Sequence, residues 1–118
     1  MSRIDEDEVK TTPEEQVTHE NDEELDMYVK FSKPYYFEDE VFEGLDLSGL
    51  SNLKASDLND IEKKYYKTGV ASFTPENTTT YAMIVAQKVT GLPVEFFQQL
   101  PIKYMYKVKN RVVNFFYN

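Results

Sequence analysis

The sequence has no cysteine and no tryptophan, and its single histidine, His19, lies in the N-terminal fifth of the chain. Without cysteine, neither a disulfide framework nor a thiolate metal site can form. His19 has no second histidine or cysteine near it, so we expect no metal site there. From residue 27 onward no Ser/His/Asp or Cys/His set can be assembled, and no glycine-rich phosphate loop is present. We therefore expect a non-catalytic protein with no cofactor.

The sequence also lacks long apolar runs. None approaches the ~20 residues that a membrane-spanning helix needs. The N-terminus is acidic, whereas a signal peptide begins with basic residues followed by an apolar stretch. We expect an intracellular, soluble protein with no membrane partner, and a length of 118 residues predicts a single domain.

Negative charge is concentrated at one end of the chain. Residues 1–26 hold 11 acidic and two basic side chains, a net charge of −9, whereas residues 27–118 hold 10 acidic and 11 basic ones, a net charge of +1. The first segment has no aromatic residue, so we predict a disordered acidic tail that keeps the protein in solution rather than docks specifically. The near-neutral remainder is not typical of a nucleic-acid-binding domain.

Alternating apolar and polar residues from Met27 predict a strand, which Lys33–Pro34 should interrupt because proline cannot donate to a ladder. Residues 35–43 then predict a hairpin. Its acidic tip, Glu38–Glu40, is interpreted as a solvated turn rather than a cation site, since no EF-hand spacing accompanies it. Residues 44–55 predict an irregular connector held to the core by its leucines.

Helical periodicity and end signals dominate the rest of the chain. Ser56 is the expected N-cap of the first helix and Gly69 its end, while Thr74 and Pro75 should open the second helix and Gly91 should close it. The fold class is thus α+β and mostly α: short N-terminal strands, then about four helices. The predicted segments are a tail at 1–26 and one domain at 27–118, with strands in 27–43, a connector at 44–55, and helices at about 57–67, 75–90, 93–100 and 102–117.

The last predicted helix has more apolar surface than one buried face requires. One stripe, expected to face the core, comprises Met105, Val108, Val112, Phe115 and Phe116. A second stripe comprises Ile102, Tyr106, Val113 and Tyr117. This second stripe is either covered by the rest of the domain or exposed as a protein-contact surface. Residues 101–118 carry four bases and no acid, which suggests that the acidic tail lies near this helix until a partner competes.

Three stretches of the sequence follow one another in a recognisable order: FSKPYYFEDEVFEGLDLSGLSNLKASDLNDIEKKY, then YAMIVAQKVTGLPVEFFQQLP, and then VKNRVVNFFY. Over residues 27–118 this order resembles the tail assembly chaperones of long-tailed bacteriophages and prophages of Gram-positive hosts. The match is a pattern of segments and not a catalytic signature. The acidic N-terminal segment lies outside it.

The resemblance implies a non-catalytic chaperone that binds the long, helical tape measure protein, keeps it soluble and helps recruit the major tail tube protein. It also implies self-association around the tape measure protein, a longer second product made by a programmed frameshift, and a place in the host cytoplasm with absence from the mature virion. The alternative is a structural head-tail joining or tail protein that the virion retains. The candidate contact residues are Ile102, Tyr106, Val113 and Tyr117, followed by Phe96 and Phe97.

Overall fold

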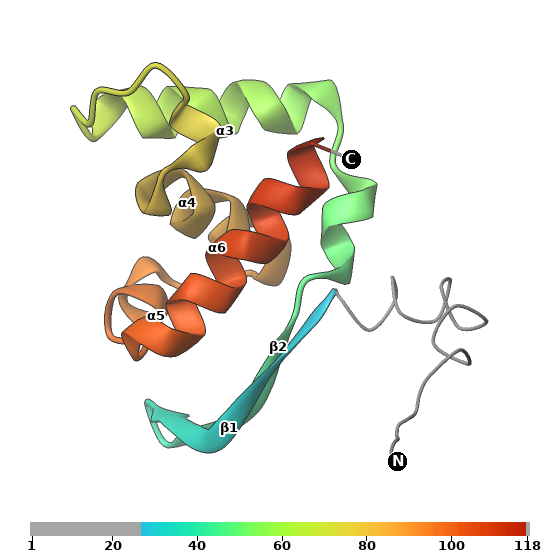
Figure 1. Cartoon of the computed structure of the whole chain (residues 1–118), viewed down its shortest axis with the longest axis vertical. Helices are drawn as coiled ribbons and strands as arrows, with labels where there is room; N and C mark the ends of the chain where they lie inside the picture. The colour runs from blue at the N-terminus through green and yellow to red at the C-terminus, as the bar shows by residue number, and fades with distance from the viewer. Residues whose placement is uncertain (1–26, 118) are drawn as a thin grey trace, which may run out of the picture.

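A long antiparallel hairpin opens the part of the chain that this computed structural model describes, residues 27–117 (Figure 1). Four α-helices and two short 3-10 helices follow within that range, which confirms the predicted fold class. The prediction of a disordered tail at 1–26 lies outside the described residues. The elements are β1 (Tyr28–Phe37), β2 (Glu40–Asp46), η1 (Ser48–Asn52), α3 (Ala55–Lys67), η2 (Pro75–Asn77), α4 (Thr79–Thr90), α5 (Val94–Gln98) and α6 (Ile102–Tyr117).

The hairpin is longer than the sequence suggested. β1 runs straight through Lys33–Pro34, and the register between β1 and β2 is irregular only between Lys30 and Tyr35. This irregularity removes Pro34 from the hydrogen-bonded ladder, so the strand does not have to end there. The turn consists of Glu38 and Asp39 alone, with φ of 49° and 66°, as a two-residue hairpin turn requires. Glu40, predicted as part of the tip, is the first residue of β2.

The helix starts show two further corrections. Ser56 lies inside α3, because the carboxylate of Asp57 accepts the backbone N–H of Lys54 at 2.9 Å and sets the helix start at Ala55, two residues earlier than predicted. Thr74 and Pro75 open the short η2 rather than α4. The N-cap of α4 is Thr78, whose hydroxyl accepts the backbone N–H of Tyr81 at 3.1 Å.

The helix ends agree better with the sequence. Gly91 ends α4 in the left-handed conformation, with φ of 77°, and its N–H donates to the carbonyl of Gln87 at 2.8 Å. Gly69 also has a positive φ and follows α3 by two residues. Leu45, Leu47 and Leu50 are buried, so the connector is held to the core by leucines as predicted.

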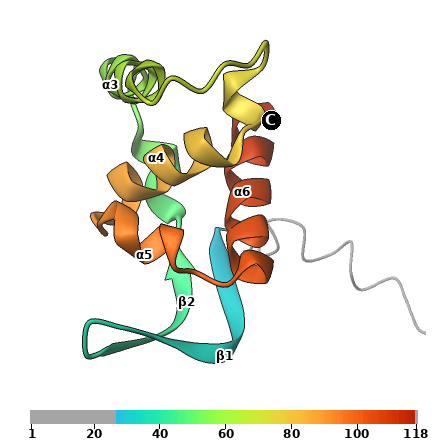
Figure 2. The same cartoon turned by 90° about the vertical axis from the view of Figure 1, so that its left-hand side faces the viewer.

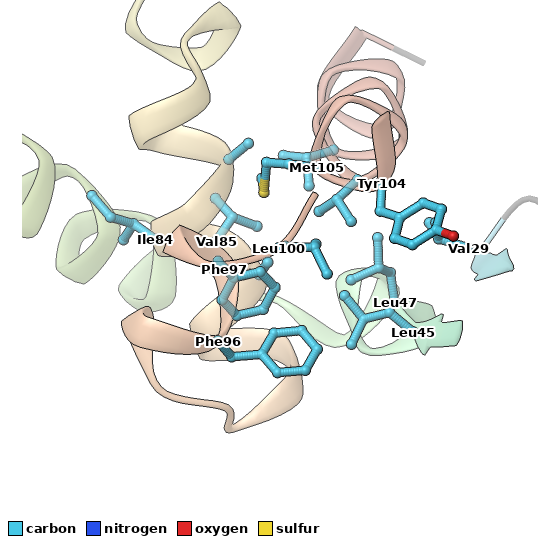
Figure 3. Packing of buried hydrophobic residues seen from close by; sticks show 14 of the residues in the cluster. Val29, Leu45, Leu47, Ile84, Val85, Phe96, Phe97, Leu100, Tyr104 and Met105 are labelled. Carbon is cyan, nitrogen blue, oxygen red and sulfur yellow. The ribbon is translucent and has the colours of Figure 1, made fainter. Parts of the chain in front are cut away.

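The core lies where the inner face of the hairpin meets α4, α5 and α6 (Figure 3). Phe96 is fully buried there, and its ring centroid lies 4.8 to 5.5 Å from those of Phe37, Phe42, Tyr35 and Phe97. Phe97 is 1% exposed. Both residues were predicted as candidate contacts. That prediction is wrong, since burying two large aromatic rings here stabilises the fold itself.

The two ends of the molecule are formed by different elements. The tip of the hairpin lies at one end of the longest axis, and α3 with the loop that follows it lies at the other (Figures 1 and 2). α6 lies along the body between them, in contact with both α4 and β1. Within residues 27–117 no helix has the length and apolar content to cross a membrane.

Candidate protein-contact surface

Tyr104 sets the orientation of α6. Its ring is buried and stacks on that of Phe31 in β1, with centroids 4.5 Å apart and planes 14° from parallel. Its hydroxyl lies 3.0 Å from that of Ser32 and accepts the backbone N–H of Lys33 at 2.9 Å. These hydrogen bonds, that of Ser32 above all, lower the pKa of Tyr104. The helix is thus fixed against the edge of β1, and its remaining faces are set by the helical period.

The second apolar stripe of α6 is exposed. Ile102 is 85% exposed, Tyr106 61% and Tyr117 59%, while Val113 is half-buried between them. The alternative in which the domain covers this stripe is therefore wrong for the described residues. By contrast Met105, Val108 and Val112 are buried, as predicted for the core face. Phe115 and Phe116 are only partly buried against the core.

The exposed stripe has a cationic border. α6 carries Lys103, Lys107, Lys109 and Arg111, and no acidic residue. The ammonium group of Lys109 lies 5.9 Å from the ring centroid of Tyr106, within the range of a cation–π contact. A partner that covers the stripe would therefore meet apolar side chains flanked by positive charge.

A groove lies beside the N-terminal half of the stripe. It has a volume of about 460 Å³. Its lining includes the exposed Ile102 and Tyr106 of α6, Met83 of α4, and the buried Leu100 and Met105. The other lining residues are Thr79, Phe97, Gln98 and Lys109. Such a mixture of methionine, aliphatic and aromatic side chains suits an apolar helix face, because methionine adapts its shape to irregular surfaces.

The C-terminal half of the stripe is held to the body. The hydroxyl of Tyr117 donates a hydrogen bond to the carboxylate of Glu76 at 2.9 Å. This hydrogen bond, followed by partial desolvation, raises the pKa of Tyr117. The last turn of α6 is thereby connected to η2, so the stripe is presented by a helix that is fixed at both ends.

A metal centre or acid–base chemistry would require suitably placed titratable side chains among the described residues. No group of three or more His, Cys, Asp or Glu side chains within residues 27–117 is placed to hold a metal ion. The strongest perturbation of a titratable group is at Tyr81, whose pKa is raised to about 12, first by burial and then by the nearby carboxylates of Glu62 and Glu76. A tyrosine held neutral in this way is a core residue and not an activated acid or base.

Sequence reasoning missed a second group of exposed apolar side chains. Phe73 is fully exposed, Tyr66 is 66% exposed and Val70 39%, all at the C-terminal end of α3 or in the loop after it. The segment 69–74 has no helical or strand period, so periodicity gives no signal there. The signal that could have found it is the occurrence of Val70 and Phe73 within a loop otherwise made of small and polar residues.

Comparisons with protein-family models, with curated proteins and with solved structures find no match to this chain.

Proposed function

We propose that this chain is a non-catalytic tail assembly chaperone of a long-tailed bacteriophage or prophage, which binds and solubilises the tape measure protein in the host cytoplasm and helps recruit tail tube subunits. The order of sequence segments suggests the family. One observation in the molecule supports a binding role: the stripe of Ile102, Tyr106, Val113 and Tyr117 is exposed on a helix fixed to the body, beside an apolar groove.

The chemistry of this surface favours a helical client. An amphipathic helix binds by placing side chains at intervals of three, four and seven residues into an apolar groove. The stripe itself follows such intervals, with Ile102, Tyr106, Val113 and Tyr117 spaced by four, seven and four residues. The four bases and no acid on α6 favour a helix with acidic flanks.

The size of the surface favours many weak contacts over one strong one. The groove of about 460 Å³ accommodates only a few side chains of a partner. A long helical rod can bind many copies of one small protein, and repeated weak contacts on a common partner give a high total affinity. A chaperone that must later leave the rod is suited to contacts of this kind.

The test is co-expression of the tape measure protein with this chain, measured as the fraction of that protein in the soluble lysate. The wild-type chain should raise this fraction. Replacing two exposed stripe residues, Ile102→Asp and Tyr106→Asp, should abolish the effect while leaving the thermal unfolding of the chain unchanged. A control with the same added charge, Asn52→Asp and Asn59→Asp, changes exposed positions outside α6 and should remain as active as the wild type.

Two outcomes would contradict the proposal. A tape measure protein that is equally insoluble with and without the chain would remove the chaperone role. Detection of the chain in purified, mature particles would favour the alternative, a structural head-tail joining or tail protein.

A further inference from the structure

The hairpin has an outer face that no other part of residues 27–117 covers. Tyr36 and Val41 lie directly opposite each other on β1 and β2, and they are 74% and 51% exposed. Phe37 and Phe42, one residue along each strand, point the other way and pack against Phe96. The outer face therefore presents an apolar pair near the tip of the hairpin, and nothing within the fold requires that pair to be apolar.

This apolar pair is surrounded by negative charge. The hairpin, residues 28–46, has a net charge of −3, from five carboxylates (Glu38, Asp39, Glu40, Glu43 and Asp46) and two lysines of β1 (Lys30 and Lys33). Glu43 lies two residues after Val41, on the same side of β2, and Glu38 and Asp39 form the turn. A binding partner for this face must supply apolar side chains together with positive charge.

The opposite end of the same molecule has the complementary composition. Residues 63–75 contain three bases and no acid: Lys63, Lys64 and Lys67. The large side chains of Tyr66, Val70 and Phe73 are exposed there. Among the described residues, Ala71, Ser72 and Phe73 of this loop line a hollow of about 300 Å³. We call this region the α3 end.

We infer that the outer face of the hairpin docks onto the α3 end of a second copy of this chain, with Tyr36 and Val41 against Tyr66 and Phe73 and the hairpin carboxylates against the lysines. Both surfaces are present on every molecule, and they lie at opposite ends of its longest axis (Figures 1 and 2). Each copy can therefore bind one neighbour at either end. Such head-to-tail contacts form a ring or an open helical filament, depending on the rotation between neighbours.

Symmetric pairing is disfavoured by charge. Two hairpins face to face would bring together two groups of five carboxylates, and two α3 ends would bring together two groups of lysines. α6 is also cationic, but it lies along the side of the molecule rather than at its end (Figure 2). The inferred contact leaves the stripe of α6 uncovered, so it does not depend on what α6 binds.

Sedimentation velocity of the full chain at increasing protein concentration tests the inference. The wild type should associate, and association should weaken as salt rises from about 0.1 M to about 1 M, because the Debye length falls from about 10 Å to about 3 Å. The hairpin variant Glu38→Lys with Glu43→Lys should weaken association about tenfold or more, and so should the α3-end variant Lys63→Glu with Lys67→Glu, because each places like charges together.

The decisive experiment mixes the two charge-reversed variants. Over residues 28–46, which include Lys30 and Lys33, the hairpin variant changes the net charge from −3 to +1, and over residues 63–75 the α3-end variant changes it from +3 to −1. The two ends of each variant then carry charge of the same sign, so neither should associate alone, yet an equimolar mixture should associate in alternation. Phe73→Ser should weaken wild-type association without lowering the melting temperature, since Phe73 is fully exposed.

Each contrary result overturns the inference. These results are a wild-type chain that stays monomeric at about 0.1 M salt, charge-reversed variants that associate like the wild type, and a mixture that remains monomeric. Reversal at α6 instead, by Lys103→Glu with Lys107→Glu, should leave association unchanged. Loss of association in that variant would place the acceptor on α6. If this inference fails, the co-expression test with the tape measure protein still stands, because that test concerns the α6 stripe and not the two ends of the molecule.

Discussion

Two buried tyrosines should respond in opposite directions to loss of the hydroxyl group. Tyr65 is 1% exposed, and its hydroxyl has no hydrogen-bond partner among the described residues. The Tyr104 hydroxyl, in contrast, accepts the backbone N–H of Lys33 at 2.9 Å and lies 3.0 Å from that of Ser32. Replacing each tyrosine with phenylalanine keeps the ring and removes only the oxygen. The pair therefore isolates the energetics of a satisfied and an unsatisfied buried hydroxyl.

The expected magnitudes follow from the hydrogen bonds. An unpaired buried polar group costs roughly 1–3 kcal/mol, so Tyr65→Phe should stabilise the fold by about 1 kcal/mol. Tyr104→Phe removes two hydrogen bonds worth roughly 0.5–1.5 kcal/mol each and should destabilise the fold by about 1–2 kcal/mol. For a domain of this size 1 kcal/mol shifts the melting temperature by roughly 4–8 °C. The two variants should therefore melt on opposite sides of the wild type.

Thermal unfolding followed by circular dichroism measures both shifts, with urea unfolding as a second estimate of the free energy. Tyr66→Phe is the matched control, because Tyr66 neighbours Tyr65 in sequence but is 66% exposed, and its melting temperature should not change. If Tyr65→Phe lowers the melting temperature as much as Tyr104→Phe does, the Tyr65 hydroxyl makes a stabilising contact and the reasoning is refuted.

Three further predictions concern the core, the pH response and a helix end. Phe96→Ala should lower the free energy of unfolding by about 3–5 kcal/mol, measured by urea unfolding, because Phe96 is fully buried among aromatic rings. A smaller decrease would mean that neighbouring side chains fill the cavity. The raised pKa of Tyr81, about 12, favours the neutral phenol in the fold. This contribution to stability is complete below about pH 10, the unfolded value, and is lost as the pH rises toward 12. Tyr81→Phe should move the alkaline unfolding midpoint upward, and an unchanged midpoint would contradict this. Gly91→Ala should lower the free energy of unfolding by about 1 kcal/mol. Backbone strain is the only cause, since φ is 77° and a Cβ there meets no atom within 4 Å, so an unchanged melting temperature would refute it.

The features predicted correctly are those that depend on local physics. Gly91 needs no distant contact to adopt a positive φ, and the leucines of the connector are buried because they are the only large apolar side chains there. The errors at Ser56 and Thr74 also have a local origin. In each case a second capping residue lies within four residues, and the hydrogen bonds of Asp57 and Thr78 show which one the helix uses.

Features that depend on distant contacts could not be predicted. Tyr104 looks like one more aromatic residue beside lysines, and its burial depends on Phe31 and Lys33, about 70 residues earlier in the chain. The burial of Phe96 and Phe97 likewise depends on the inner face of the hairpin. A periodic pattern identifies which side chains share a face of a helix, but it does not identify which element covers that face.

The distribution of charge bears on whether the two proposed binding surfaces act independently of one another. The domain is near neutral as a whole, yet its acids are concentrated on the hairpin and its bases on the α3 end and on α6. Charges separated by more than a Debye length are largely screened from one another, so a neighbour bound at the hairpin should alter binding at α6 only weakly. The stripe variants Ile102→Asp and Tyr106→Asp should then lose the client while still associating normally. The hairpin variants should lose self-association, yet a single copy should still bind the tape measure protein. Only the additional affinity that comes from repeated contacts should be lost.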